Sequence, residues 1–367
     1  DLSGQMRGKR MPQKDQRKLA SGDLRMPLSV LNVDIWGADI INSPLLFASG
    51  DGDGYLLPTN RGPVPMPWLD QPSALVGMWM FEEDGRPFEG DPRHALAQIL
   101  DRYAARGWQV VAATELEFYL IDDSAESLRP PKDPASNRKI DSSAILSLQQ
   151  LDAFEAFFSE LYQSCAQMGI NAQAASSEAG IGQFEISLQH GDALRIADDT
   201  WLFKTLLKGL ARKHGYAASF MAKPYPNDAG NGLHLHFSVI DEAGENIFDD
   251  GTKQGSPLLQ NAIAGCLATM RAATLGFAPH ANSYTRMDPE NHAPTSICWG
   301  YENRTAALRI PAGAHRARRI EHRVAGGDIN PFLTLSLILG AALLGIEDDL
   351  TPPPPITGNA YIQDLPQ

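Results

Sequence analysis

The sequence is poor in cysteine, in basic residues and in long hydrophobic runs. Its three cysteines lie far apart without a CxxC pair, which argues against a disulfide framework or zinc knuckle and favours a cytoplasmic location. Acidic residues (44) outnumber basic residues (31), and the resulting net charge of −13 repels nucleic acid and anionic membrane surfaces. The most apolar stretch, 331–346, is too short to cross a bilayer and predicts a buried helix. We therefore expect neither nucleic acid nor a membrane as a partner.

A chain of 367 residues exceeds the usual limit of one hydrophobic core, so we expect two domains. The first residues contain no Met start and no apolar segment, so we expect a trimmed start and no secretion signal. Short alternating runs with clustered glycines extend to about residue 67, and longer elements follow. Interleaved strands and helices predict an α+β domain on an antiparallel sheet. Helices are expected at 91–107, 151–168, 198–213, 257–276 and from 331, and strands at 108–121, 182–188, 217–222, 233–240, 304–310 and 319–324.

Two pairs of glutamates suggest a site for a hard cation. Glu115 and Glu117 alternate along an expected strand, which places both carboxylates on one face about 7 Å apart. Glu178 and Glu185 flank the glycine-rich turn 179–182, which can bend the chain so that both point into one cavity. Taken alone, either pair is a weak signal, because acidic residues on a solvated surface are the more common explanation.

His234, His236 and Ser238 alternate on one face of another expected strand. An imidazole is a minority ligand of Mg²⁺ or Mn²⁺, so one of these histidines could join carboxylates at a metal, although structural histidines are as common. The preceding glycine-containing loop, 227–232, lets the backbone approach a phosphate or substrate closely.

Six arginines lie between residues 304 and 323 of this acidic protein, and guanidinium groups bind phosphate and carboxylate bidentately. Arg319, Glu321 and Arg323 share one strand face, and a surface network with Glu302 and Asp328 is the alternative explanation. Carboxylates and a histidine for a divalent metal, next to clustered arginines, are typical of phosphoryl transfer.

These residues resemble the glutamine synthetase family over nearly the whole chain. The segment KPYPNDAGNGLHLHFS at 223–238 resembles the nucleotide-site signature of that family, and the other matching segments follow in the family's order: TELEFYL at 114–120, SEAGIGQFE at 177–185, NSYTR at 282–286, ENRTAALRIP at 302–311 and RRIEHRVAGGDINPF at 318–332. The resemblance implies a partial β-grasp N-terminal domain at 1–67. It also implies a catalytic domain at 68–367, incomplete at its C-terminal end, with an antiparallel sheet barrel and flanking helices.

The resemblance also implies an ATP-dependent reaction with Mg²⁺ or Mn²⁺. Glu117, Glu178 and Glu185 would bind one metal, and Glu115, His234 and Glu321 a second. Arg286, Arg323 and Gly230 would bind glutamate, and Arg304 would face the transferred phosphoryl group. His236, Ser238, Arg309 and Arg319 would bind the nucleotide.

The second substrate is expected to be a small amine. Family members that use ammonia carry a glutamate six residues after the arginine of NSYTR, but this chain has His292 there, with Glu290 as the nearest carboxylate. An imidazole lacks the fixed negative charge that attracts ammonium. His292 and the residues of the motifs therefore make the chain most similar to the γ-glutamylpolyamine synthetase branch. By the same resemblance, Asp34 and Asp53 would line the amine pocket across a subunit boundary. The family forms ring-shaped homo-oligomers, commonly dodecamers, with active sites between subunits.

Three other functions remain open at this point. They are an ammonia-using glutamine synthetase, a non-catalytic assembly protein of the same family, and a metallohydrolase that uses the HxH pair and the carboxylates to activate water.

Overall fold

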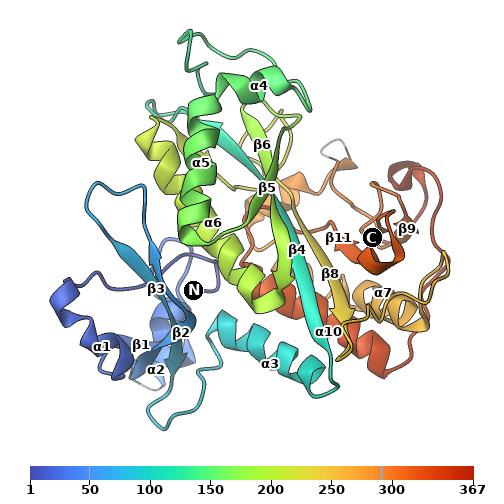
Figure 1. Cartoon of the computed structure of the whole chain (residues 1–367), viewed down its shortest axis with the longest axis horizontal. Helices are drawn as coiled ribbons and strands as arrows, with labels where there is room; N and C mark the ends of the chain where they lie inside the picture. Colours follow the sequence, from blue (N-terminus) through green and yellow to red (C-terminus); the bar gives the residue numbers. More distant parts are fainter. Residues whose placement is uncertain (49, 290–291) are drawn as a thin grey trace.

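The structure is a computed structural model that describes residues 1–48, 50–289 and 292–367. It contains a small sheet near the N-terminus and a large sheet in the remainder of the chain (Figure 1). The small sheet has the order β1-β2-β3, made of Arg25–Pro27, Asp53–Pro65 and Ala74–Phe81. The large sheet has the order β5-β6-β4-β8-β11-β10-β9, and β7 pairs separately with β4.

The strands of the large sheet are β4 (Gln109–Ile121), β5 (Ala172–Ser177), β6 (Gln183–Asp192), β7 (Ala217–Ser219), β8 (Leu233–Ile240), β9 (Trp299–Tyr301), β10 (Leu308–Ile310) and β11 (Ile320–His322). The α-helices are α1 (Arg17–Ala20), α2 (Pro44–Phe47), α3 (Pro92–Ala104), α4 (Leu148–Ala153), α5 (Glu155–Met168), α6 (Ala193–Lys213), α7 (Pro257–Thr269), α8 (Thr274–Phe277), α9 (Ala281–Arg286) and α10 (Pro331–Glu347). Within the described residues, no helix is both long and apolar enough to traverse a bilayer.

The large sheet is mixed and open, which corrects the expectation of an antiparallel barrel. Its path ends at β5 and at β9, and these edge strands do not pair with each other. Strands β9 and β10 are parallel. Residues 302–307 carry the chain from the end of β9 back to the level of its first residue, so that β10 runs in the same direction as β9 and no hairpin forms. The β-grasp description and the division after residue 67 stay predictions, and strand β3 of the small sheet lies beyond that division.

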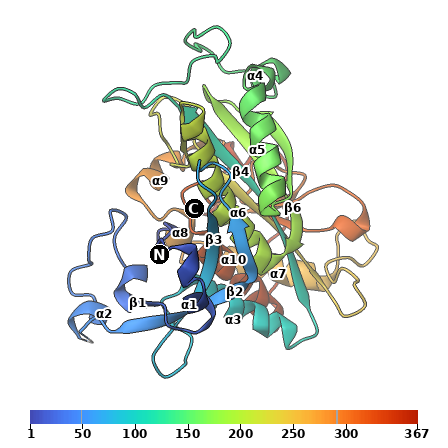
Figure 2. The ribbon, with the colours of Figure 1, turned by 60° about the vertical axis from the view of Figure 1, so that its left-hand side comes forward.

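Helix α6 packs against β4 and β6, and α10 packs against α3, α6 and α7 (Figure 1). The small sheet lies beside α3 and α6 (Figure 2). Two buried ion pairs fasten this part of the molecule to α6, one between Arg61 of β2 and Asp199 and the other between Arg93 of α3 and Asp198. The small sheet and α3 are therefore anchored to α6, the helix that packs against the large sheet.

Alternation along the strands separates the core from a polar face. On β4, Leu116 and Phe118 are fully buried, whereas Glu115 and Glu117 alternate with them and project to the opposite face. On β8, Leu235 belongs to the same hydrophobic core. The sequence expectation for these two strands is therefore confirmed.

Other expected elements are shorter or divided. The expected helix at 151–168 is interrupted at Phe154, whose backbone leaves helical geometry while its ring is buried. The expected helix at 257–276 ends at Thr269, and α8 follows separately. At Phe154, where the ring is buried, tertiary packing overrides local helix propensity.

Leu116 supplies a test of the core. Leu116→Ala should lower the free energy of unfolding by about 2–5 kcal/mol, because it removes a fully buried side chain and leaves a cavity. Leu148→Ala, at an exposed position, should change it by less than about 0.5 kcal/mol. Urea unfolding of both variants measures the difference, and equal midpoints would contradict this account of the core.

Candidate active site

A belt of polar residues crosses one face of the large sheet, and strand register brings its members together. Residues opposite one another in neighbouring strands project to the same face. The opposed pairs are Glu185 and Glu117 between β6 and β4, Glu115 and His234 between β4 and β8, His236 and Glu321 between β8 and β11, and Glu321 and Arg309 between β11 and β10. The paired side chains, from Glu185 on β6 to Arg309 on β10, thus form one continuous belt across the sheet.

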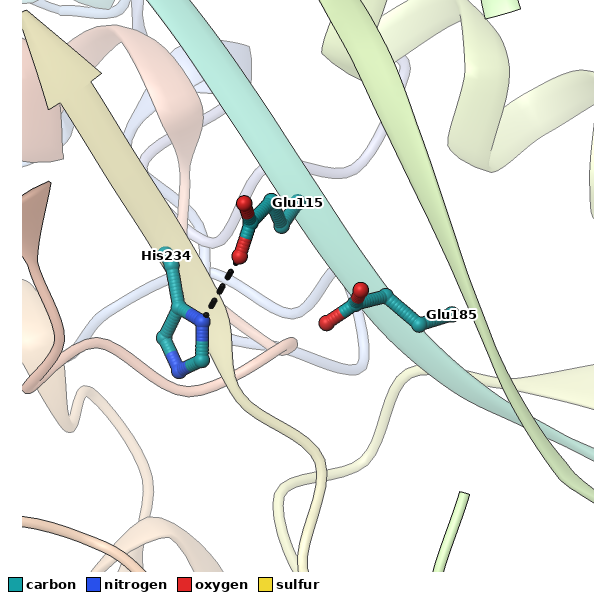
Figure 3. A group of neighbouring side chains, drawn as sticks. All are labelled: Glu115, Glu185 and His234. Atoms are coloured by element: carbon teal, nitrogen blue, oxygen red, sulfur yellow. Dashed lines mark hydrogen bonds and ion pairs between the residues drawn. The ribbon is translucent and has the colours of Figure 1, made fainter. Parts of the chain in front are cut away.

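Glu115 lies at the centre of this belt. Its Oε2 is 3.1 Å from Nδ1 of His234, and its Oε1 is 3.0 Å from Nε2 of His236. Burial opposes the charged form of Glu115, but the two imidazoles outweigh burial and lower its pKa well below the usual range. Glu185 reaches toward the same space from β6 (Figure 3). Glu115 is therefore an ionised carboxylate shared by two histidines.

The remaining carboxylates of the belt are crowded. Burial, followed by repulsion from Glu115, Glu117 and Glu178, raises the pKa of Glu185 to about 9. Burial and then Glu117 raise the pKa of Glu178 to about 7. A divalent cation would relieve this repulsion and would favour the charged carboxylates.

Two groups of side chains could each hold a cation. Glu115, Glu185 and His234 place ligand atoms within 4.8 Å of one another, as do Glu115, His236 and Glu321. Oxygen ligands with one imidazole suit Mg²⁺ or Mn²⁺, so the donor sets fit the expected metals. These groups divide the residues differently from the sequence expectation, because His236 lies with Glu115 and Glu321. Oε2 of Glu117 instead accepts a hydrogen bond from the backbone N–H of Gly232, at 2.6 Å.

Guanidinium groups gather at the β10–β11 end of the belt. The buried Glu321 accepts a hydrogen bond from Arg309 at 2.8 Å and another from Arg323. Burial would raise the pKa of Glu321, but the cationic neighbours lower it. Nε of Arg319 donates to Nδ1 of His236 at 3.2 Å. This end of the belt can bind an anion.

Buried Arg286 and the loop 229–232 form another border of the site. Arg286 donates to the carbonyl oxygen of Val324 at 2.9 Å. A Cβ atom at Gly230 would lie 2.7 Å from Cγ of Arg286, so this close approach requires glycine. Ser238 follows His236 on the same face of β8, and Arg323 lies two residues after Glu321 on the chain.

Three predicted catalytic residues lie outside this contact network. Arg304 is exposed and makes no hydrogen bond or ion pair with the described residues, although its charge lowers the pKa of Glu178. His292 is exposed, with a φ of 56°. Asp34 accepts hydrogen bonds only from N–H groups of its own loop, as far as the structure describes. Glu290, the alternative carboxylate to His292, falls outside the described residues.

Sequence reasoning missed two buried residues beside the site. The hydroxyl of Tyr119 donates to the carbonyl oxygen of Ala229 at 2.7 Å. The side-chain amide of Gln183 contacts both glycine-rich segments. Gln183 shares a strand face with Glu185, and this alternation was the only available signal.

Comparison with known proteins gives consistent results. Residues 89–366 match the glutamine synthetase catalytic domain. The chain is 36% identical to γ-glutamylputrescine synthetase PuuA of Escherichia coli, over 99% of this chain and 78% of that protein. It is 34% identical to a glutamate–isopropylamine ligase of a Pseudomonas species, over 85% of this chain and 68% of that protein. The structure of apo GmaS superposes with a TM-score of 0.84 at 29% identity, covering 99% of this chain and 80% of that one. On this evidence the chain belongs to the glutamine synthetase family.

Proposed function

We propose that this protein is an ATP-dependent ligase that joins the γ-carboxylate of glutamate to a small organic amine. The observation that supports this most is the continuous belt on the sheet, with carboxylates and histidines at one end and arginines at the other. The first end suits divalent cations and the second suits a phosphate chain, and phosphoryl transfer needs both side by side.

The reaction proceeds in two steps through γ-glutamyl phosphate. ATP transfers its terminal phosphoryl group to the γ-carboxylate, and the amine then attacks the activated carbonyl carbon and expels phosphate. The amine loses one proton, for which His292 is the proposed acceptor and Asp34 a proposed contributor from a neighbouring subunit. Water must be excluded, because it would hydrolyse the acyl phosphate.

The residues of the belt have distinct proposed roles. Mg²⁺ or Mn²⁺ would supply charge neutralisation and Lewis acidity when held by Glu115, Glu117, Glu178, Glu185, His234 and Glu321. His236 contacts Glu115 and lies beside Glu321. It would therefore bind the cation itself, or hold Glu115 and Glu321 in place next to the nucleotide. Arg309, Arg319 and Ser238 bind ATP, and Arg304 faces the transferred phosphoryl group. Arg286, Arg323 and Gly230 bind glutamate.

Two arguments support an organic amine as the second substrate. PuuA and the isopropylamine ligase are both named for joining glutamate to an organic amine. In addition, by the resemblance of the NSYTR segment, His292 would occupy the position at which ammonia-using members carry a glutamate. A cytoplasmic, ring-shaped homo-oligomer with active sites between subunits, commonly a dodecamer, is part of the same proposal.

Metal binding should depend on pH in a defined direction. Because the pKa values of Glu178 and Glu185 are raised, the metal-free fold retains protons there and loses stability as pH rises from about 4.5 toward 9. Mg²⁺ competes with those protons, so it should raise Tm more at about pH 9 than at about pH 6.

Thermal unfolding with Mg²⁺ and with chelator measures this effect. Glu185→Gln should reduce the response to Mg²⁺, whereas Glu126→Gln, at an exposed position in another loop, should not. An equal Mg²⁺ response at both pH values would contradict the proposed cation site.

Arg304→Ala should lower kcat by about two to four orders of magnitude and change the Kd of ATP by less than about threefold. A guanidinium aimed at the transferring phosphoryl group acts mainly in the transition state. Phosphate release and equilibrium nucleotide binding measure the two quantities, with exposed Arg138→Ala as the control. A change in ATP affinity alone would make Arg304 a binding residue.

His292→Glu should raise kcat/KM for ammonia relative to kcat/KM for the preferred amine, because a carboxylate attracts ammonium. His292→Gln removes the imidazole without adding charge and should not produce this gain. The assay compares ammonia with putrescine, spermidine, ethanolamine and an aromatic amine. If the unmodified protein preferred ammonia over every amine, it would be a glutamine synthetase in the strict sense.

A further inference from the structure

The side chain of Gln183 connects the two glycine-rich segments that border the site. It is 2% exposed and lies at the first residue of β6. Its Oε1 accepts a hydrogen bond from the N–H of Gly180 at 2.9 Å. Its Nε2 donates to the carbonyl oxygen of Gly230 at 2.9 Å and to Oδ1 of Asn231 at 3.0 Å. One amide thus spans the turn 179–182 and the loop 229–232, which lie far apart in sequence.

The orientation of this amide follows from its partners. Nδ2 of Asn231 donates to the carbonyl oxygens of Ser219 and Met221, so Oδ1 of Asn231 must be the acceptor that faces Gln183. The N–H of Gly180 can only donate, and it therefore selects the oxygen of Gln183. Both ends of the amide are fixed, and neither a carboxylate nor an apolar side chain can satisfy all three partners.

Each segment held by Gln183 also holds residues of the site. The turn 179–182 separates Glu178 from Glu185, and the N–H of Glu178 donates to the carbonyl oxygen of Gln183 at 2.9 Å. In the loop, the N–H of Gly232 donates to Glu117, and Gly230 approaches Arg286 closely. The distance between the turn and the loop therefore sets how far Glu178 and Glu185 lie from Glu117 and Arg286.

The nucleotide end of the belt is supported differently. Arg309 is held by Glu321, and Arg319 is held by His236, all within β8, β10, β11 and the residue that precedes β11. Neither glycine-rich segment contributes to these contacts. A change at Gln183 should therefore affect one end of the belt more than the other.

We propose that Gln183 is a positioning residue that keeps the turn 179–182 and the loop 229–232 at the separation needed for cation and glutamate binding. This inference rests on the proposed ligase function. Gln183 is buried beneath both segments and acts through Glu178, Glu185 and the loop. Losing its three hydrogen bonds leaves buried donors and acceptors unpaired, which favours a shift of both segments.

Gln183→Met tests this proposal because it preserves side-chain length and removes all three hydrogen bonds. Gln189→Met is the matched control, since Gln189 lies on the same strand with an exposed side chain. Three quantities are measured: the Kd of Mn²⁺ by electron paramagnetic resonance without nucleotide, the KM of glutamate and the KM of ATP. Gln183→Met should weaken Mn²⁺ binding and raise the glutamate KM by about tenfold each, as expected for lost buried hydrogen bonds, and change the ATP KM by less than about twofold.

Two outcomes would overturn the proposal. One is an unchanged Mn²⁺ Kd and glutamate KM in a folded Gln183→Met variant. The other is an equal loss in all three constants, which would show a general structural role. If Gln183→Met does not fold, Gln183→Asn replaces it, because an amide one methylene shorter cannot reach both segments, and the same split is expected.

The unmodified protein separates failure of this inference from failure of the proposed function. If the unmodified protein released no phosphate with glutamate, ATP, Mg²⁺ and any amine of the panel, the ligase function would fail. If it were active and Gln183→Met matched it in every constant, only the role of Gln183 would fail.

Discussion

Partial burial of several glutamates beside one another is the constraint on which the site depends. Four carboxylates lie close together, those of Glu115, Glu117, Glu178 and Glu185. After burial itself, the neighbouring carboxylates raise the pKa values of Glu178 and Glu185. Burying a charged carboxylate without a hydrogen bond or an opposite charge costs free energy. The fold compensates Glu115 with two imidazoles and Glu117 with a backbone N–H, but it leaves Glu178 and Glu185 with raised pKa values. This residual imbalance is what a divalent cation would correct.

The sheet supplies the rigidity that such a site requires. Strand β4 is central in the sheet and places Glu115 and Glu117 on one face, while Leu116 and Phe118 anchor the strand in the core. Neighbouring β8 repeats the arrangement with its histidines. Charge then changes sign along the belt, from carboxylates on β4 and β6 to arginines near β10 and β11. In a protein of net charge −13, this localised positive end can attract a polyanion to one place.

Much of this arrangement could be predicted from the sequence, because alternation determines which residues share a face. The positions of β4 and β8 and the shared faces of Glu115 with Glu117 and of His234 with His236 follow from period-two spacing. Strand order does not follow from spacing, and it is strand order that brings His236 to Glu115 and Glu321. The open, mixed sheet was also not predicted, because the short strand β9 was not recognised and its parallel pairing with β10 depends on the path of residues 302–307. Gln183 gave no chemical signal, since its role depends on two segments that only the fold brings together.

The residues proposed for amine handling differ physically from those proposed for glutamate activation. Glu115, His234 and Glu321 are held by strands, register and ion pairs. Asp34 and His292 instead lie in loops or turns, and in the described structure neither contacts the belt by a hydrogen bond or ion pair. A phosphoryl-transfer centre tolerates little displacement, because its groups must meet charge that develops at defined positions. Loops on a rigid scaffold can change shape and composition without disturbing that centre. The separation of sheet-borne and loop-borne residues thus gives a physical reason why one activation chemistry can serve different amines.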